Sequence, residues 1–472
     1  MSNELIGKDA TEIVSLLKSE EVTPNDLLDA LEGRIAEVDN KVNALPTLCF
    51  DRARKHASGL MARPVAERGK LAGLPLPIKD LAGVKGVRST YGSPIFADLV
   101  PEQSDILVEH VEAEGGVVYA KSNTPEFGAG ANTFNEVFGR TLNPWNTTRS
   151  AAGSSGGSAV ALATGMAWVA HGSDMGGSLR NPASFCGIVG MRPSPGRVAC
   201  SRPSAIDGFL GVEGPMARNV EDLALLYDAM RGEEPGDPLS LPHDGVSYLE
   251  EARGSWKPKK VAVSRDLGIT PVEPEVAEIV TAAARRFEEA GVVVEEAHPD
   301  LSEAHDCFQT LRAVAFATGL EPLLREYRDQ LKPEVIWNVE KGLELKAADI
   351  VKAEHQRAAM FHRTRAFFEE YDLLLTPATI VSPYPVEQRF VEECDGVKFG
   401  NYVEWLGIAY AITNVACPAI SIPAGFTKED LPVGIQIVGP PRGDARAIRG
   451  ARVLEDILGL RGMTPMDPKV MN

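Results

Sequence analysis

Short apolar runs alternate with amphipathic segments along most of this 472-residue chain. This alternation is typical of an α/β protein whose strands are covered by helices on both faces of a sheet. No Gly/Ser linker, low-complexity segment or repeat divides the chain, so we expect one large α/β domain over residues 1–472. The runs typical of strands are residues 117–120, 260–263, 292–294, 373–376, 419–423 and 433–438, of which 292–294 and 373–376 have the pattern of buried strands. The helical patterns are residues 220–230, 276–290, 402–413 and 444–458.

Three further stretches of the chain are expected to be helical. Residues 1–65 are expected to be helical, and Thr23 has the position of a helix cap. A helix of about a dozen residues is expected from Ser104. Residues 300–370 form an acidic helical stretch, which we expect to cap the domain or lie at its edge.

Charge excludes two classes of partner. The chain has 48 basic and 66 acidic residues, a net charge of −18 and a pI near 5.0. General nucleic-acid binding and docking on anionic membranes both require a basic surface, so neither is expected. The sequence also lacks a bilayer-length apolar stretch and a secretory signal, and its six cysteines form no CxxC pair. These features predict a cytoplasmic protein with reduced thiols.

Residues 139–215 are rich in Gly and Ser and contain few charges, so backbone must approach backbone or a ligand closely there. The region contains two serine clusters, at 153–158 and 172–178. A serine hydroxyl is a weak nucleophile until a base removes its proton, and neighbouring glycines free backbone N–H groups to hold an oxyanion. The alternative interpretation is a pair of tight glycine turns.

Two residues are candidates for the base. His171 lies close to the second cluster, although such a histidine is most often structural, and none of the eight histidines forms an HExxH or HxH zinc motif. Lys79 follows an apolar run that could place its amine in a buried site. A lysine acts as a base only when burial lowers its pKa from about 10.4. Considered alone, Lys79 is more typical of a surface cation paired with Asp80, and its interpretation as a base depends on the serine clusters.

Two short matches are interpreted as chance. Residues 153–157 fit GxSxG around Ser155, but no apolar strand precedes them as a nucleophile elbow requires. Residues 15–18 fit SxxK from Ser15, but the other motifs of a penicillin-binding site do not occur in the sequence.

Several motifs together closely resemble the amidase signature family, and the resemblance covers nearly the whole chain. They are residues 77–80, 143–146, 152–159, 172–180, 182–183, 186–187, 189–190, 192–198, 418–423 and 432–436. The resemblance implies a single α/β domain with a mixed central sheet and a catalytic core over residues 70–220. It also implies hydrolysis of a C–N bond without a metal or cofactor.

The resemblance further implies a role for each motif residue. Ser178 is the expected nucleophile, Lys79 the base, and Ser154 the bridge between them, taking part in a cis peptide bond. The expected oxyanion hole consists of the backbone N–H groups of Met175, Gly176, Gly177 and Ser178. Expected supporting residues are Ser155, Ser173, Asp174 and Arg180, and the expected substrate-pocket residues are Phe127, Gly128 and Ala129. The chain departs from the common pattern at Met175, where threonine is frequent, and at Ala151-Ala152, which replace Pro-Gly.

The sequence therefore predicts an amidohydrolase that cleaves a carboxamide of a small molecule. One alternative is the glutaminase subunit (A-type) of a tRNA-dependent amidotransferase. It ranks behind the free-standing amidase because the sequence after residue 300 resembles the free-standing amidases more than that subunit. The other is a non-catalytic member of the fold that acts as a binding module. A fatty-amide hydrolase is disfavoured because no membrane anchor is visible. A homodimer is possible on general grounds.

Overall fold

The computed structural model describes residues 2–201 and 209–471. It is the expected α/β domain, built around a sheet with the strand order β10-β9-β11-β15-β14-β7-β8-β6. Strands β10, β9 and β11 run parallel to one another, and the remaining neighbours are antiparallel, so the sheet is mixed. These strands are β6 (Val169–Asp174), β7 (Val189–Arg192), β8 (Val212–Ala217), β9 (Lys260–Val263), β10 (Val293–Glu296), β11 (Leu373–Pro377), β14 (Ala419–Phe426) and β15 (Pro432–Val438).

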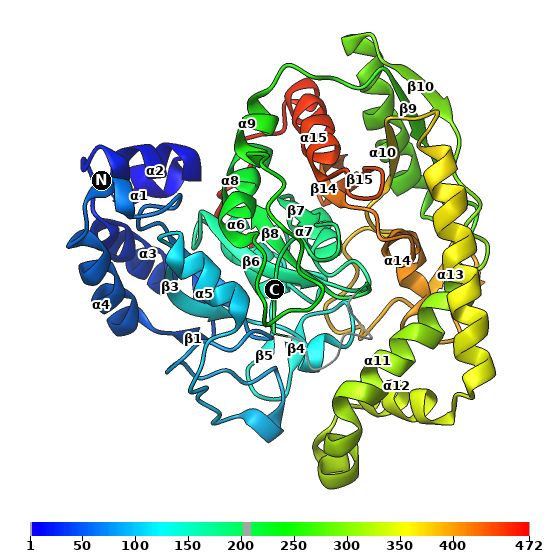
Figure 1. The fold of residues 1–472 in the computed structure, drawn as a ribbon, viewed down its shortest axis with the longest axis horizontal. Coiled ribbons are helices and arrows are strands. Elements are labelled where there is room, and N and C mark those ends of the chain that lie inside the picture. The colour runs from blue at the N-terminus through cyan, green and yellow to red at the C-terminus, as the bar shows by residue number, and fades with distance from the viewer. Residues whose placement is uncertain (1, 202–208, 472) are drawn as a thin grey trace.

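Helices cover both faces of this sheet (Figure 1). On one face, the N–H of Gly434 in β15 donates to the Ser184 hydroxyl of α7 at 2.8 Å. Successive residues of a strand point to opposite faces, and the register of β11 with β15 puts Leu373 on the face opposite Gly434. There Leu373 packs beside Gly450 of α15. The helices are α1 (Ser2–Gly7), α2 (Ala10–Lys18), α3 (Pro24–Val38), α4 (Phe50–Met61), α5 (Ile106–Ala113), α6 (Gly156–Ala163), α7 (Arg180–Cys186), α8 (Val220–Met230), α9 (Tyr248–Arg253), α10 (Pro274–Arg285), α11 (Ala304–Tyr327), α12 (Pro333–Glu344), α13 (Ala347–Phe367), α14 (Gly407–Asn414) and α15 (Asp444–Leu458).

Two predictions from the sequence are wrong in detail. The strand expected to be buried at 292–294 is the edge strand β10, in which Val293 is 52% exposed although Val292 and Val294 are buried. The helix expected from Ser104 begins later, because the Asp105 side chain accepts from the Leu107 N–H and so caps α5. The helix ends at Ala113 and is therefore shorter than the expected dozen residues. By contrast, Thr23 caps α3 as predicted, with the Asp26 side chain completing a capping box.

A second, three-stranded sheet has the order β1-β3-β2, with β1 at Thr47–Leu48, β2 at Pro75–Lys79 and β3 at Val117–Ser122. Every residue of β2 and β3 is buried, and β2 lies beside β6 of the large sheet. The two remaining strand pairs are small: β4 (Phe134–Asn135) with β5 (Gly139–Arg140), and β12 (Glu393–Cys394) with β13 (Val397–Lys398). Lys79 is therefore placed at the end of a buried strand, facing the large sheet.

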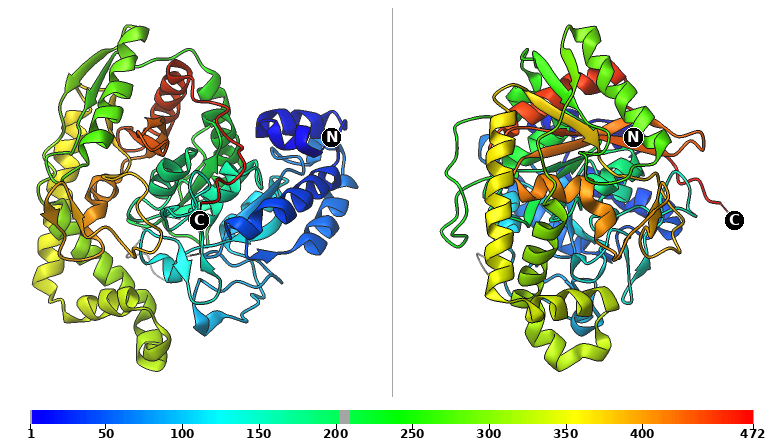
Figure 2. Two further views of the ribbon diagram at one scale, coloured as in Figure 1. Left: turned by 180° about the vertical axis from the view of Figure 1, so that it is seen from behind. Right: turned by 90° about the vertical axis from the view of Figure 1, so that its right-hand side faces the viewer.

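Helices α11, α12 and α13 lie on the side of the molecule opposite the N-terminal helices α1 to α4 (Figure 2). Phe308 of α11 stacks on Tyr410 of α14, with ring centroids 4.2 Å apart. This contact holds α11 against the domain and brings its inner face to the cavity described below. Within residues 2–201 and 209–471, no helix has the length and apolar character that a bilayer span needs.

Candidate active site

The amine of Lys79 is enclosed by serine hydroxyls at the end of β2. Lys79 is fully buried, and its Nζ lies 2.7 Å from Ser154 Oγ, 2.9 Å from Ser155 Oγ and 2.9 Å from Ser173 Oγ. The interpretation of Lys79 as a surface cation paired with Asp80 is wrong, because the Asp80 carboxylate instead bonds Lys121 at 2.9 Å. The structure thus brings together residues from three separate parts of the sequence.

Burial lowers the pKa of Lys79 from its ordinary 10.5 to about 7, against the opposing charges of Glu213 and Asp174. A pKa near 7 makes the neutral amine abundant at physiological pH, which a lysine in water is not. The side chain therefore has the proton affinity that a general base needs.

The hydroxyl contacts also indicate how a neutral amine is accommodated. A neutral amine has two N–H donors and one lone pair, so one of the three hydroxyls must donate to it. Ser155 Oγ contacts the Ser173 carbonyl oxygen at 3.2 Å, which gives its own hydrogen a separate acceptor. Ser154 makes the shortest contact with Nζ, and its hydroxyl lines the cavity. The lone pair of Lys79 is therefore left to the hydroxyl of Ser154 or Ser173, which both line the cavity, and Ser154 makes the shorter contact.

The first serine cluster is held at the start of α6 by close backbone contacts. The peptide bond between Gly153 and Ser154 is cis, as the resemblance implies. A Cβ on Gly156 would lie 2.2 Å from the Thr133 hydroxyl oxygen, and one on Gly157 would lie 2.3 Å from the backbone nitrogen of Asn123. Only glycine fits at these two positions, which explains part of the composition of the cluster.

The second cluster is anchored by a buried ion-pair network. Arg180 donates to both carboxylate oxygens of Asp174, at 3.0 and 2.8 Å, and Arg192 donates to the Asp174 carbonyl at 2.8 Å. Burial opposes ionisation of Asp174, but the guanidinium groups of Arg180 and Arg192 hold its pKa well below the usual range. The carboxylate in turn accepts from the Gly177 and Leu179 N–H groups, which fixes the turn that carries Ser178.

This network corrects one expectation about the oxyanion donors. The N–H of Gly177 donates to Asp174 Oδ1 at 3.0 Å, so in this geometry it is already bonded and does not point freely at an oxyanion. In the described part of the chain, no hydrogen bond uses the N–H groups of Met175, Gly176 or Ser178. These three are the available donors. The sequence could not reveal this, because the partner of Gly177 depends on the turn conformation.

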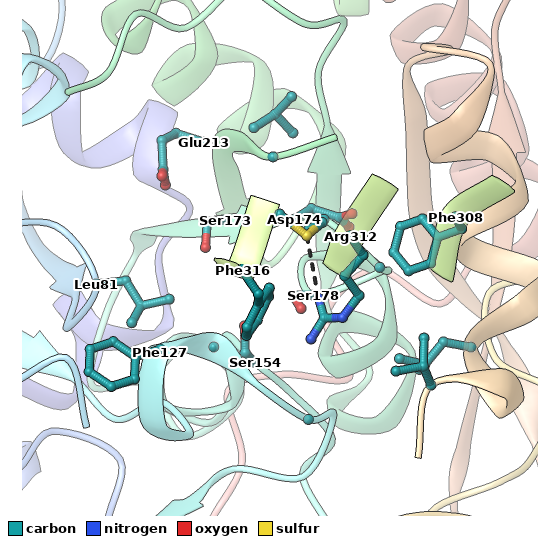
Figure 3. Close-up of a pocket in the computed structure, with 18 of the residues that line it drawn as sticks. Leu81, Phe127, Ser154, Ser173, Asp174, Ser178, Glu213, Phe308, Arg312 and Phe316 are labelled. Atoms are coloured by element: carbon teal, nitrogen blue, oxygen red, sulfur yellow. Dashed lines mark hydrogen bonds between the residues drawn. The ribbon is translucent and has the colours of Figure 1, made fainter. Parts of the chain in front are cut away.

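Ser154 and Ser178 both line one cavity of about 230 Å³ (Figure 3). The Ser155 N–H donates to the Ser178 carbonyl at 3.2 Å, which ties the two clusters together. Among the hydrogen bonds of residues 2–201 and 209–471, none joins the hydroxyls of Ser154 and Ser178. The cavity is lined by Leu81, Phe127, Gly128, Gly130, Ser154, Ser173, Asp174, Met175, Gly176, Ser178, Cys200, Ser201, Gly211, Val212, Glu213, Phe308, Arg312, Phe316, Val403 and Leu406.

The expected pocket residues are placed differently from one another. Phe127 and Gly128 line the cavity, but Ala129 does not. Ala129 is fully buried in a small apolar cluster with Phe316 and the inner faces of α11 and α12, so its side chain supports the wall from behind. The expectation that Ala129 lines the pocket is therefore wrong.

The sequence places the pocket walls only by range, near 125–135, 305–345 and 385–410, and the far wall of the cavity does come from the last two of these ranges. Phe308, Arg312 and Phe316 come from α11, and Val403 and Leu406 come from the segment before α14. The spacing of four residues between 308, 312 and 316 marks one helix face, which is the sequence signal that these three side chains lie together. Which face points to the serines is decided by the packing of α11 on α14.

His171 has a structural position beside the base. It is buried, its Nδ1 accepts from the Lys79 backbone N–H at 3.2 Å, and its Nε2 lies 2.7 Å from Glu213 Oε2. Because Nδ1 is an acceptor, the ring hydrogen is on Nε2 and donates to Glu213. His171 thus orients the strand that carries Lys79. Within the described ranges, no three His, Cys, Asp or Glu side chains converge as a metal site would require.

A buried amine of near-neutral pKa, bonded to serine hydroxyls at the wall of a cavity, is the arrangement expected of a serine hydrolase with lysine as its base. Comparison with known proteins identifies the family. Residues 26–448 match the family described as Amidase, and the chain belongs to this amidase signature family. It is an amide-hydrolysing enzyme.

Individual relatives span the full chain. It is 32% identical over 467 residues to an acylamidase of Rhodococcus erythropolis, covering 98% of both chains. It is also 32% identical over 489 residues to the A-type subunit of the glutamyl-tRNA(Gln) amidotransferase of Halothermothrix orenii, covering 98% of this chain and 99% of that one. The crystal structure of a bacterial aryl acylamidase of the amidase signature family superimposes with a TM-score of 0.88 and 27% identity, covering 97% of this chain and 99% of that one.

Proposed function

We propose that this enzyme hydrolyses a carboxamide of a small molecule through an acyl-enzyme on Ser178, with Ser154 as proton relay and Lys79 as base. One observation carries the proposal: the Lys79 amine is fully buried, has a pKa of about 7, and bonds three serine hydroxyls. An ammonium ion on the surface could not perform this role.

The reaction follows from these positions. Neutral Lys79 accepts the proton of the Ser154 hydroxyl while Ser154 accepts that of Ser178, and Ser178 Oγ attacks the amide carbon. The N–H groups of Met175, Gly176 and Ser178 stabilise the oxyanion of the tetrahedral intermediate. When the C–N bond breaks, the relay returns the proton to the leaving amine. Water then attacks the ester carbonyl of the acyl-enzyme by the same relay, which releases a carboxylic acid and restores Ser178.

The Ser154–Ser178 step requires a hydrogen bond that forms as substrate enters the cavity. Catalytic hydrogen bonds commonly shorten in the substrate complex, and the two hydroxyls already line the same wall. Rotation of a serine side chain about its Cα–Cβ bond is sufficient to reorient the hydroxyl.

A fluorophosphonate probe tests the nucleophile directly. We expect covalent labelling of the wild type at Ser178, identified by peptide mass spectrometry, and no labelling or amide hydrolysis in Ser178→Ala. Ser15→Ala is the matched control, because Ser15 lies on α2 and its hydroxyl donates to the Thr11 carbonyl, away from the cavity. Full activity in Ser178→Ala would contradict the proposal, and a folded wild type that neither labels nor hydrolyses amides would favour a binding module.

Glutamine hydrolysis is the second candidate, and the similarity to the amidotransferase chain of Halothermothrix orenii supports it. If this chain has that role, we expect glutaminase activity that depends on a companion subunit isolated with it. Turnover of simple amides by the purified chain alone, with little activity toward glutamine, would instead favour a free-standing amidase.

A further inference from the structure

Arg312 places a positive charge at the wall of the candidate active site. Its side chain extends from α11 into the same cavity as Ser154 and Ser178, and only 7% of the residue is exposed (Figure 3). One terminal nitrogen donates to the Tyr402 hydroxyl at 2.9 Å, and the other lies 3.3 Å from the Met175 sulfur. The buried Nε has no hydrogen-bond partner in the described part of the chain. Among the described residues, no anion is hydrogen-bonded to the guanidinium, which is held in place by these contacts.

This environment differs from that of the other deeply buried arginines in residues 2–201 and 209–471. Arginine remains charged at any physiological pH, so burial without a carboxylate or carbonyl acceptor is costly. Arg312 donates to no carboxylate or carbonyl oxygen of these residues. The others all do: Arg68 to Glu20, Arg180 and Arg192 to Asp174, and Arg218 to the carbonyls of Ile6 and Lys8.

The groups around Arg312 position it but do not neutralise it. The guanidinium carbon lies 4.2 Å from the centroid of the Phe316 ring and 5.9 Å from that of Tyr402, so aromatic faces fix its plane. A thioether is a weak hydrogen-bond acceptor that an incoming oxygen can replace.

We propose that Arg312 binds a carboxylate of the substrate, so that this enzyme acts on amides that also carry a carboxylate group. The inference rests on the proposed function, because it names the substrate class of that same site. A planar guanidinium matches a carboxylate through two parallel hydrogen bonds, and the cavity is small enough that the anion lies within a few bonds of the reacting carbonyl.

The other charges of the cavity fit this placement. Asp174 is already neutralised by Arg180 and Arg192. Glu213 is bonded to His171 and lies apart from the Arg312 guanidinium, with Ser173 between them in the view of Figure 3. A substrate carboxylate is therefore attracted toward the wall formed by α11. The apolar walls from Phe127, Phe308 and Leu81 accommodate the carbon chain that joins the two groups.

Two matched substrate pairs test the proposal. Glutaramate and pentanamide differ by a carboxylate in place of a methyl group in the acyl part, and N-benzoylglycine and N-ethylbenzamide differ in the same way in the amine part. We expect kcat/KM of the wild type to be about 10- to 100-fold higher for the charged member of at least one pair, as a charge-assisted hydrogen bond provides. Arg312→Met should bring that ratio close to 1, and Arg312→Lys, which retains charge but not the planar fork, should retain part of it.

Arg325→Met is the matched control, because Arg325 lies on the same helix with its side chain 76% exposed. This variant should keep the wild-type ratio. Equal or lower kcat/KM for the charged member of both pairs overturns the inference, and the wild-type measurement decides this even if Arg312→Met fails to fold. The proposed function fails separately, when the turnover of these substrates survives in Ser178→Ala.

Discussion

Lys79 and Lys121 are two fully buried lysines on neighbouring strands, and their surroundings differ in one respect. Lys79 ends β2 and Lys121 lies in β3, where Lys121 is the register partner of Ile78. Lys121 Nζ donates to Asp80 Oδ1 at 2.9 Å and to the Ala82 carbonyl and Ser89 hydroxyl at 2.8 Å. Lys79 has only hydroxyl partners within the part of the chain that the structure describes.

The difference indicates what makes a buried lysine suitable as a base. Burial lowers the pKa of both side chains, but the adjacent Asp80 charge opposes this effect at Lys121. A carboxylate in contact stabilises the ammonium form, whereas a hydroxyl can either accept from an ammonium or donate to an amine. Lys121 is therefore a structural cation, and Lys79 can exchange a proton with its neighbours.

The largest expected effect is the loss of the base. Lys79→Met should lower kcat for amide hydrolysis roughly 10⁴-fold, because no other group takes the proton of Ser154. Steady-state kinetics on one amide, with circular dichroism to verify folding, provide the measurement. A variant that folds and retains a tenth of the wild-type rate would show that Lys79 is not the base.

The matching change at Lys121 should affect stability instead. Lys121→Met leaves the buried Asp80 carboxylate without its cation, which should lower the free energy of unfolding by about 3–5 kcal/mol. Urea denaturation measures the loss, and Lys121→Met with Asp80→Asn should recover part of it. If the single variant instead lost activity at unchanged stability, the contrast between the two lysines would be wrong.

The pH dependence follows from the pKa of Lys79. Because the base must be neutral, kcat/KM should fall about tenfold per pH unit below pH 7 and level off above it. The rate falls on the acid side because protonation of the Lys79 amine there removes the base. A pH profile with a neutral amide substrate measures the midpoint, and a midpoint near 10 would mean that burial does not lower this pKa.

The smallest effect should come from one hydroxyl beside the amine. Ser155→Ala removes a group that accepts from the ammonium form of Lys79, so the pKa should fall further. The bond from the ammonium should exceed that from the neutral amine by about 1 kcal/mol, or roughly 0.7 pKa unit, so the midpoint of the pH profile should move by about that amount toward acid. Movement toward alkali would mean that Ser155 stabilises the neutral amine.

Much of the fold could be predicted from local pattern. The helix over 220–230, the strand over 260–263 and the helix over 444–458 have the bounds that the apolar periodicity indicates. The exposure of β10 could not be predicted, since an apolar run at a sheet edge has the same pattern as one in the centre. The later start of α5 reflects its cap by Asp105, one residue after the expected start at Ser104.

The sequence alone determined which chemical groups this protein has: two Gly/Ser clusters, a lysine after an apolar run and the motifs of an amidase. Only the tertiary structure decided that Lys79 is buried away from Asp80, that the Gly177 N–H is bonded to Asp174, and that α11 presents Arg312 to the cavity. The physical reason is that motifs are local in the chain, whereas burial and charge pairing depend on segments that only folding brings together.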